Sequence, residues 1–171
     1  MWNDTDIPLA VFFTFRCYGT WLHGDERGAV DRNNNNYRAP KIPTNSNWRK
    51  HSQELLLHRP VTLNAESRQS VEKAIRENCS RRKWGLLALH VRTNHVHAVI
   101  NIGSKKPADA LIALKANATR QLREDRLWLY DHSPSAEKGS KRNLWNEISI
   151  WEACNYVINE QGEALPDFDW W

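Results

Sequence analysis

Two short apolar runs joined by a polar turn constrain the fold of this chain more than any other feature. Residues 84–91 are mostly apolar, the turn Arg92-Thr93-Asn94 follows, and residues 95–102 are again mostly apolar. Strand-length runs on either side of a tight polar turn are typical of a β-hairpin. We therefore predict strands over 84–91 and 95–102.

The second strand of this hairpin begins with two histidines in alternate positions, His95 and His97. Side chains two residues apart on a strand point to the same face, so both imidazoles can bind one metal ion. A His-x-His pair is a weak signal on its own, because histidines on a sheet are often exposed or satisfied by hydrogen bonds.

The segments before and after the hairpin carry strand and helix patterns. Residues 9–15 are β-branched, aromatic and too short for a typical helix, as in a central strand. Apolar residues at helical spacing predict one helix over about 65–82, with Asn64 or Thr62 as its N-cap. A second helix is expected from Pro107 to about Arg126.

The last third of the chain is less regular. Residues 130–142 are rich in Ser, Pro, Gly and Lys and predict a loop. Residues 144–151 suit either a last strand or the start of a helix, and 153–162 suit a terminal helix that Gly162 ends.

This order of elements predicts the fold class. Strand, helix, strand, strand, helix, strand and terminal helix form an α+β protein with a ferredoxin-like split βαβ antiparallel sheet, two helices on one face and a further C-terminal helix. The chain has 171 residues, 40% of them hydrophobic, and nine Trp. That is enough apolar material for one domain over residues 1–171.

A long polar insertion, at about residues 29–60, interrupts this plan. It contains four consecutive Asn and ends in a short expected helix over 48–58. Basic residues such as Arg38 occur in it together with Tyr and Trp, a mixture that can follow a phosphate backbone and stack on bases. A solvated basic loop explains the composition equally well.

Charge and cysteine content narrow the protein class only modestly. The net charge of +4 and pI near 9.1 suit a polyanionic partner, and ordinary basic enzymes share these values. Three widely spaced cysteines lack metal-ligand spacing and favour a reducing cytoplasm. No apolar run approaches the roughly 20 residues that span a bilayer, so no membrane role is expected.

The predicted terminal helix supplies the chemistry that could complete a histidine site. Tyr156 and Glu160 are four residues apart and share a helix face, whereas Gln161 is rotated away unless the helix unwinds toward Gly162. Taken without the histidines, Tyr156 would be a tyrosine that packs the helix on the sheet.

Two further stretches are candidates for binding nucleic acid. The segment after the first strand is crowded with aromatic, charged and glycine residues, and is either a connection pinned by its aromatics or part of a substrate surface. The polar face of the 107–126 helix is basic, although solvation is its default role. The candidate residues are Tyr18, Trp21, Asp25, Arg27, Arg38, Lys115, Arg120 and Arg123.

The motifs together resemble a known family. Asn94-His95-Val96-His97, with a later helix carrying Tyr-Val-x-x-x-Gln, is similar to the single-tyrosine HUH transposases of the smallest bacterial insertion sequences and their palindrome-associated relatives. The Tyr18 to Gly28 segment resembles an opening that recurs in one branch of that family. Many members place the metal-binding amide four residues after the tyrosine, where this chain has Glu160.

The resemblance implies an activity: metal-dependent cleavage and rejoining of single-stranded or hairpin DNA through a 5′-phosphotyrosine. Tyr156 would be the nucleophile on a catalytic C-terminal helix, and Mg²⁺ or Mn²⁺ would be held by His95 and His97 with Glu160 or Gln161. A single nucleophilic tyrosine per chain implies that strand exchange needs two active sites, and hence a homodimer. Two alternatives are a domesticated, non-cleaving module that binds DNA or RNA hairpins, and an unrelated metalloenzyme in which Tyr156 is incidental.

Overall fold

The fold is built on a four-stranded antiparallel sheet in the order β2-β3-β1-β4. The computed structural model describes residues 6–20, 44–163 and 165. Each strand pairs antiparallel with its neighbours, and β1 and β3 are the two central strands. The strands are β1 Ala10–Arg16, β2 Gly85–Val91, β3 His95–Asn101 and β4 Ser140–Leu144.

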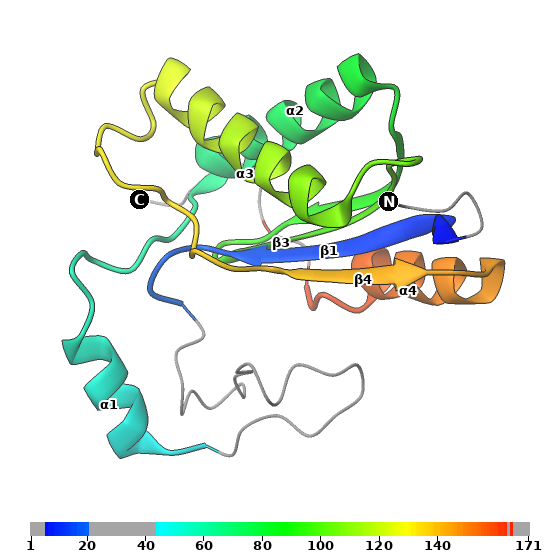
Figure 1. Cartoon of the computed structure of the whole chain (residues 1–171). Helices are drawn as coiled ribbons and strands as arrows, with labels where there is room; N and C mark the ends of the chain where they lie inside the picture. The colour runs from blue at the N-terminus through cyan, green and yellow to red at the C-terminus, as the bar shows by residue number, and fades with distance from the viewer. Residues whose placement is uncertain (1–5, 21–43, 164, 166–171) are drawn as a thin grey trace.

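Helices cover both faces of this sheet (Figure 1). α2 and α3 lie together on one face, α4 lies on the opposite face, and α1 stands apart from the sheet. The predicted α+β fold is confirmed, including the strand order of a split βαβ sheet. The helices are α1 Ser46–Glu54, α2 Ala65–Arg82, α3 Pro107–Glu124 and α4 Glu147–Asn159.

The face under α2 and α3 holds the main hydrophobic core. Alternate residues of β1, such as Phe13, are fully buried there. They pack with Ile75 of α2 and Leu114 of α3, which are also fully buried. Large apolar side chains from three elements therefore meet in one layer, and their burial is the main source of stability.

The face under α4 has a much smaller core. Its buried members are mostly small residues, and α4 contributes only Ala153 and Val157 as buried residues. Polar side chains occupy part of the same face, because β1 and β3 place Thr14, His95 and His97 on it. This face therefore combines thin packing with polar chemistry.

Local capping explains where three helices begin. The Asn64 side chain accepts a hydrogen bond from the backbone of Ser67 at 2.8 Å, which confirms Asn64 as the N-cap of α2. Pro107 stands in the first turn of α3, as predicted. Asn146 caps α4 in the same way as Asn64, through the backbone N–H of Ser149.

The C-terminal third differs from the sequence prediction. The predicted loop over 130–142 is wrong at its end, because Ser140 to Arg142 belong to β4. This strand is polar and lacks an apolar alternation, and its hydrogen bonds to β1 make it a strand. Residues 144–151, predicted as either a strand or the start of a helix, include both the last residue of β4, Leu144, and the start of α4 at Glu147.

Helix α1 and the ends of α3 and α4 are shorter than predicted. α1 ends at Glu54 instead of His58, and α3 ends at Glu124. α4 ends at Asn159 instead of Gly162, a difference that shapes the site described below. None of the helices within the described ranges is long and apolar enough to cross a membrane.

The cysteines do not form disulfides. Cys17, Cys79 and Cys154 all have free thiols. Burial raises the pKa of Cys17 to about 12 and that of Cys79 to about 11. Protonated, buried thiols are unreactive, so these two residues serve packing.

Candidate active site

The site lies on the α4 side of the sheet, where three elements meet. β3 contributes His95 and His97, β1 contributes Phe12 and Thr14, and α4 contributes Tyr156. The register places Thr14 directly opposite His97. The period of two along each strand explains why these side chains share one face.

His97 is held rigidly in this site. Its side chain is only 4% exposed, and its Nδ1 lies 2.8 Å from the Thr14 hydroxyl. Burial, reinforced by the nearby His95 and His90, lowers the pKa of His97 to about 3. The imidazole is therefore neutral near pH 7, and in the tautomer in which Nδ1–H donates to the Thr14 hydroxyl the lone pair on Nε2 is available to bind a ligand.

His95 is oriented by its neighbour Asn94. The Asn94 Oδ1 lies 2.7 Å from His95 Nδ1, and a carboxamide oxygen can only accept a hydrogen bond. Nδ1 therefore carries the proton and Nε2 carries the lone pair. Such an outer hydrogen bond is the usual way in which proteins fix the tautomer of a metal-binding histidine.

Gln161 faces this lone pair. Its Oε1 is 3.4 Å from His95 Nε2, while its amide nitrogen donates to the Tyr156 carbonyl at 3.1 Å. The amide orientation is fixed by that donation, so two electron-rich atoms point at each other. A metal ion bound between or beside them would relieve this repulsion.

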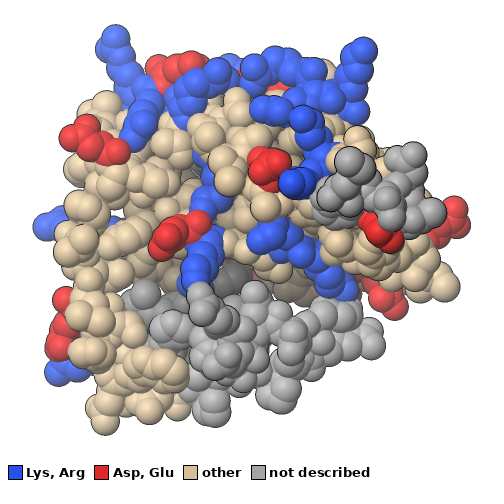
Figure 2. Space-filling view, in the orientation of Figure 1, with Lys and Arg blue, Asp and Glu red and all other residues tan. Residues whose placement is uncertain are grey.

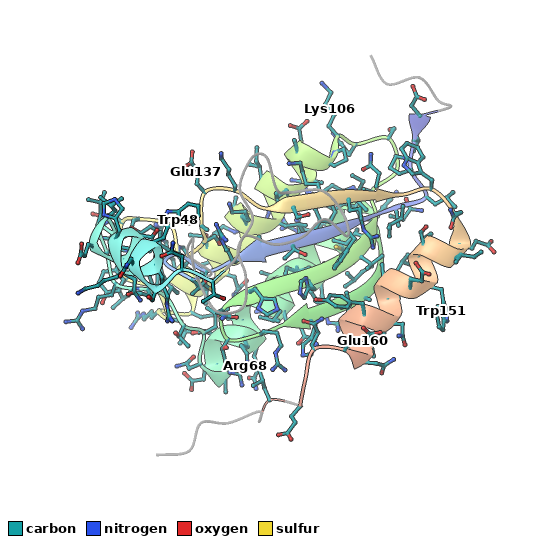
Figure 3. The ribbon with its side chains drawn as sticks, turned by 90° about the horizontal axis from the view of Figure 1, so that it is seen from below. Trp48, Arg68, Lys106, Glu137, Trp151 and Glu160 are labelled. Atoms are coloured by element: carbon teal, nitrogen blue, oxygen red, sulfur yellow. The ribbon has the colours of Figure 1, made fainter. Side chains whose placement is uncertain are left out.

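Glu160 points elsewhere, although sequence spacing favoured it. α4 ends at Asn159, and Glu160 adopts a non-helical conformation as the C-cap. Its carboxylate accepts a hydrogen bond from the Asn155 side chain at 2.9 Å. Glu160, labelled in Figure 3, lies at the exposed end of α4. Gly162 follows with a φ of +80°, a turn that glycine adopts readily. Unwinding at this point brings Gln161 toward the histidines.

Tyr156 completes the cluster from α4. Its ring is edge-on to the rings of His97 and Phe12, with centroids 5.5 Å and 6.0 Å away. The side chain is 39% exposed, so a substrate can reach it from solvent.

His90 belongs to the same cluster, although sequence reasoning gave it no role. It pairs across the hairpin with His97, and its Nδ1 lies 3.0 Å from the Val157 carbonyl. His90 therefore connects β2 to α4 beside the site. The predicted turn over 92–94 would place residue 90 opposite residue 96, whereas the observed pair Val91–Val96 brings residues 90 and 97 together, so the sequence did not reveal this neighbour.

The donor set suits a hard or borderline divalent ion. Two imidazole nitrogens and one amide oxygen lie on the same side of the sheet, from His95, His97 and Gln161. Within the described part of the chain, no three His, Cys, Asp or Glu side chains converge to hold a metal. Imidazole and carbonyl ligands fit Mn²⁺ and Mg²⁺, and a set of three leaves coordination positions for phosphate oxygens.

Among the described residues that were predicted to bind nucleic acid, none belongs to this cluster. Trp21, Asp25, Arg27 and Arg38 lie outside the described residues. Tyr18 connects the end of β1 to the segments around Leu57 and His132. Its hydroxyl accepts a hydrogen bond from the Leu57 backbone at 3.1 Å, and its ring contacts two histidine rings, those of His58 and His132.

The basic residues of α3 also have protein partners. Lys115 donates to the carbonyls of residues 136 and 137, and Arg123 donates to those of residues 130 and 131. Arg120 bonds to Asn117 and lies 3.7 Å from Glu124. Figure 2 shows Lys and Arg side chains gathered over α2 and α3, with acidic side chains among them. Lys115 and Arg123 therefore hold the loop before β4, and nucleic-acid binding by this face stays a prediction.

Comparison with known proteins shows that both histidines lie in a segment that a family model matches. The family model with the description "Transposase IS200 like" matches residues 55–148, which is more than half of the chain. The match includes both histidines and ends before Tyr156. No curated protein matches the chain.

Proposed function

The chain belongs to the IS200-like transposase family, and we propose from this premise that it cuts and rejoins single-stranded DNA with Tyr156 as the nucleophile. Membership of this family indicates a transposase-like, DNA-processing function. The proposal adds the mechanism, the residues and the metal requirement. Its substrate would be single-stranded DNA with a hairpin near the cut.

The proposed step is a transesterification at phosphorus. The Tyr156 oxygen attacks the scissile phosphate and forms a 5′-phosphotyrosine bond, while the bond from phosphorus to the 3′ oxygen breaks. The phenol proton passes to solvent, and the leaving oxygen takes a proton to become a free 3′-hydroxyl. No bond energy is lost to hydrolysis, so a 3′-hydroxyl can reverse the step and join strands.

The remaining site residues would hold a divalent ion at the scissile phosphate. His95, His97 and Gln161 are the ligands that we propose, with Glu160 outside the set. Thr14 and Asn94 would keep the two imidazoles oriented. When bound, Mg²⁺ or Mn²⁺ would stabilise the charge that develops on the phosphate oxygens.

One observation supports this proposal most strongly. Tyr156 lies beyond the residues that the family model matches, yet its ring contacts His97, which lies within them. A half-exposed tyrosine beside a neutral, rigid histidine is the arrangement that this chemistry needs. We further propose that two copies act together, because one nucleophilic tyrosine per chain serves only one strand. The proposed place of action is the cytoplasm, at the nucleoid.

Covalent capture tests the proposal. The protein is incubated with a pool of hairpin-bearing single-stranded oligonucleotides and Mn²⁺, and denaturing electrophoresis then detects a protein–DNA adduct. We expect an adduct with the wild type, none with Tyr156→Phe, and none with the wild type in EDTA. His95→Ala should form no adduct either with or without Mn²⁺.

Tyr130→Phe is the matched control, because Tyr130 is 62% exposed and lies in the loop after α3. It should form adduct as the wild type does. An adduct that survives Tyr156→Phe would show that the nucleophile is a different residue. Intact DNA binding with no adduct across the whole pool would favour the non-cleaving hairpin-binding module.

A further inference from the structure

We propose that Arg16 and Arg142 form a phosphate-binding site beside the tyrosine, which holds the backbone of the DNA strand on both sides of the scissile phosphate. This inference rests on the proposed function and adds a substrate-binding surface to it. Neither arginine was among the residues that the sequence predicted to bind DNA.

Strand register puts both arginines on the face of the sheet that carries the histidines. Arg16, the last residue of β1, pairs with His95 across the β1–β3 ladder. Arg142 of β4 pairs with Phe12 on the other side of β1. Paired residues in adjacent strands project to the same face, so the two cations flank the site from two strands.

Arg142 is connected to the nucleophile through a single aromatic ring. Its guanidinium carbon lies 5.5 Å from the centroid of the Phe12 ring. The same ring contacts the rings of Tyr156 and His97, with centroid separations of 6.0 Å and 5.4 Å. Phe12 therefore contacts both the cation and the proposed nucleophile.

Arg16 occupies the opposite end of the site, beside His95. It is half-buried, and burial lowers the pKa of its guanidinium from the ordinary value. Arg16 and Phe12 are four residues apart on β1, which is about 13 Å at the rise of a strand. At that separation the two arginines would contact different phosphates of one strand.

The chemistry of the surroundings favours a phosphate backbone as the ligand. An arginine fork matches phosphate oxygens in bidentate geometry, and partial burial strengthens that attraction. None of the four strands contains an Asp or Glu, so the sheet itself offers no competing carboxylate.

The test measures binding without cleavage, in the Tyr156→Phe protein. The probe is a fluorescein-labelled oligothymidylate of about 16 nucleotides, long enough for a typical single-strand site. Its dissociation constant is measured over a series of salt concentrations. Each phosphate contact contributes about 0.7 to the slope of log K against log salt for single strands.

Arg16→Ala and Arg142→Ala should each lower that slope by about 0.7 and weaken binding about 10- to 100-fold at low salt. Arg142→Lys should keep the slope and lose part of the affinity, because it retains the charge without the fork. Arg76→Ala is the control, since Arg76 lies at an exposed position of α2 and its guanidinium is 2.8 Å from the Glu72 carboxylate. It should leave the slope unchanged.

Unchanged slopes in both Arg→Ala proteins would overturn the proposal, as would no measurable binding of the probe at low salt. A change in only one of them would remove the other arginine from the site. A merely structural role predicts a lower melting temperature with the slope retained in Arg142→Lys and Arg142→Ala alike. The proposed function fails separately, if the wild type forms no Tyr156 adduct, because this binding assay needs no cleavage.

Discussion

The two faces of the sheet are built differently although they share every strand. Under α2 and α3, large apolar side chains such as Phe13, Ile75 and Leu114 fill a continuous core. Under α4, the buried apolar residues are few and mostly small, and histidines and Thr14 take the remaining positions. One face therefore stabilises the fold, and the other face can hold polar residues in fixed positions.

The difference shows how a small protein can bear the cost of a polar site. Burying a neutral imidazole is unfavourable unless it is hydrogen-bonded, and His97 has Thr14 as its partner. The large core on the opposite face supplies the stability that this arrangement lacks. Substitutions on the two faces should accordingly affect different properties.

The largest expected effect comes from a matched pair of neighbours, Phe13 and Phe12, which point to opposite faces. Phe13→Ala should lower the free energy of unfolding by about 3–5 kcal/mol, because Phe13 is fully buried in the main core. Phe12→Ala should lower it by less, because Phe12 is only partly buried. Urea unfolding measures both. Equal losses would contradict the division of roles between the faces.

A second comparison separates Gln161 from Glu160 at the end of α4. Gln161→Ala should weaken Mn²⁺ binding by about 100-fold, because it removes the oxygen that faces His95. Glu160→Ala should change the affinity by less than about threefold, since its carboxylate bonds to Asn155. Calorimetric titration of Mn²⁺ measures both affinities. The reverse ranking would restore Glu160 as the ligand.

The polar face should also make stability depend on pH in metal-free protein. The pKa of His97 is about 3 in the folded state and about 6.5 in the unfolded chain. Between these values the unfolded chain binds a proton that the folded state does not, so acid favours unfolding. Stability should fall by about 1.4 kcal/mol per pH unit below pH 6.5, or about 2 kcal/mol at pH 5, with no contribution above pH 6.5.

Urea unfolding in EDTA at pH 7 and pH 5 checks this expectation against His97→Gln, which cannot take up the proton. The variant should lose about 2 kcal/mol less than the wild type over that interval. An equal loss in the two proteins would mean that other groups dominate the acid dependence.

The smallest effect is expected on the outer surface of the α2 and α3 layer. Lys115→Ala should cost about 1 kcal/mol of stability, because two hydrogen bonds to the loop before β4 are lost. Lys105→Ala, at an exposed position before α3, is the control and should be neutral. Thermal unfolding measures both. A large loss of DNA binding by Lys115→Ala at unchanged stability would show that Lys115 belongs to the binding surface.

The hairpin and the two long helices could be predicted from sequence because their signals are local. Apolar periodicity, the Asn64 cap and Pro107 each act over a few neighbouring residues, and all three predictions are confirmed. β4 could not be found in this way. Its sequence is polar, and the hydrogen bonds that make it a strand come from β1, more than a hundred residues earlier.

The site divides along the same line. The sequence alone determined that His95 and His97 share one face, since the strand period fixes it, and it brought forward Tyr156 as their partner. Only the tertiary structure decided that Gln161, and not Glu160, faces His95, because α4 unwinds after Asn159 and packs against the sheet. The same holds for His90, Arg16 and Arg142, whose places depend on pairing between strands that no local pattern encodes.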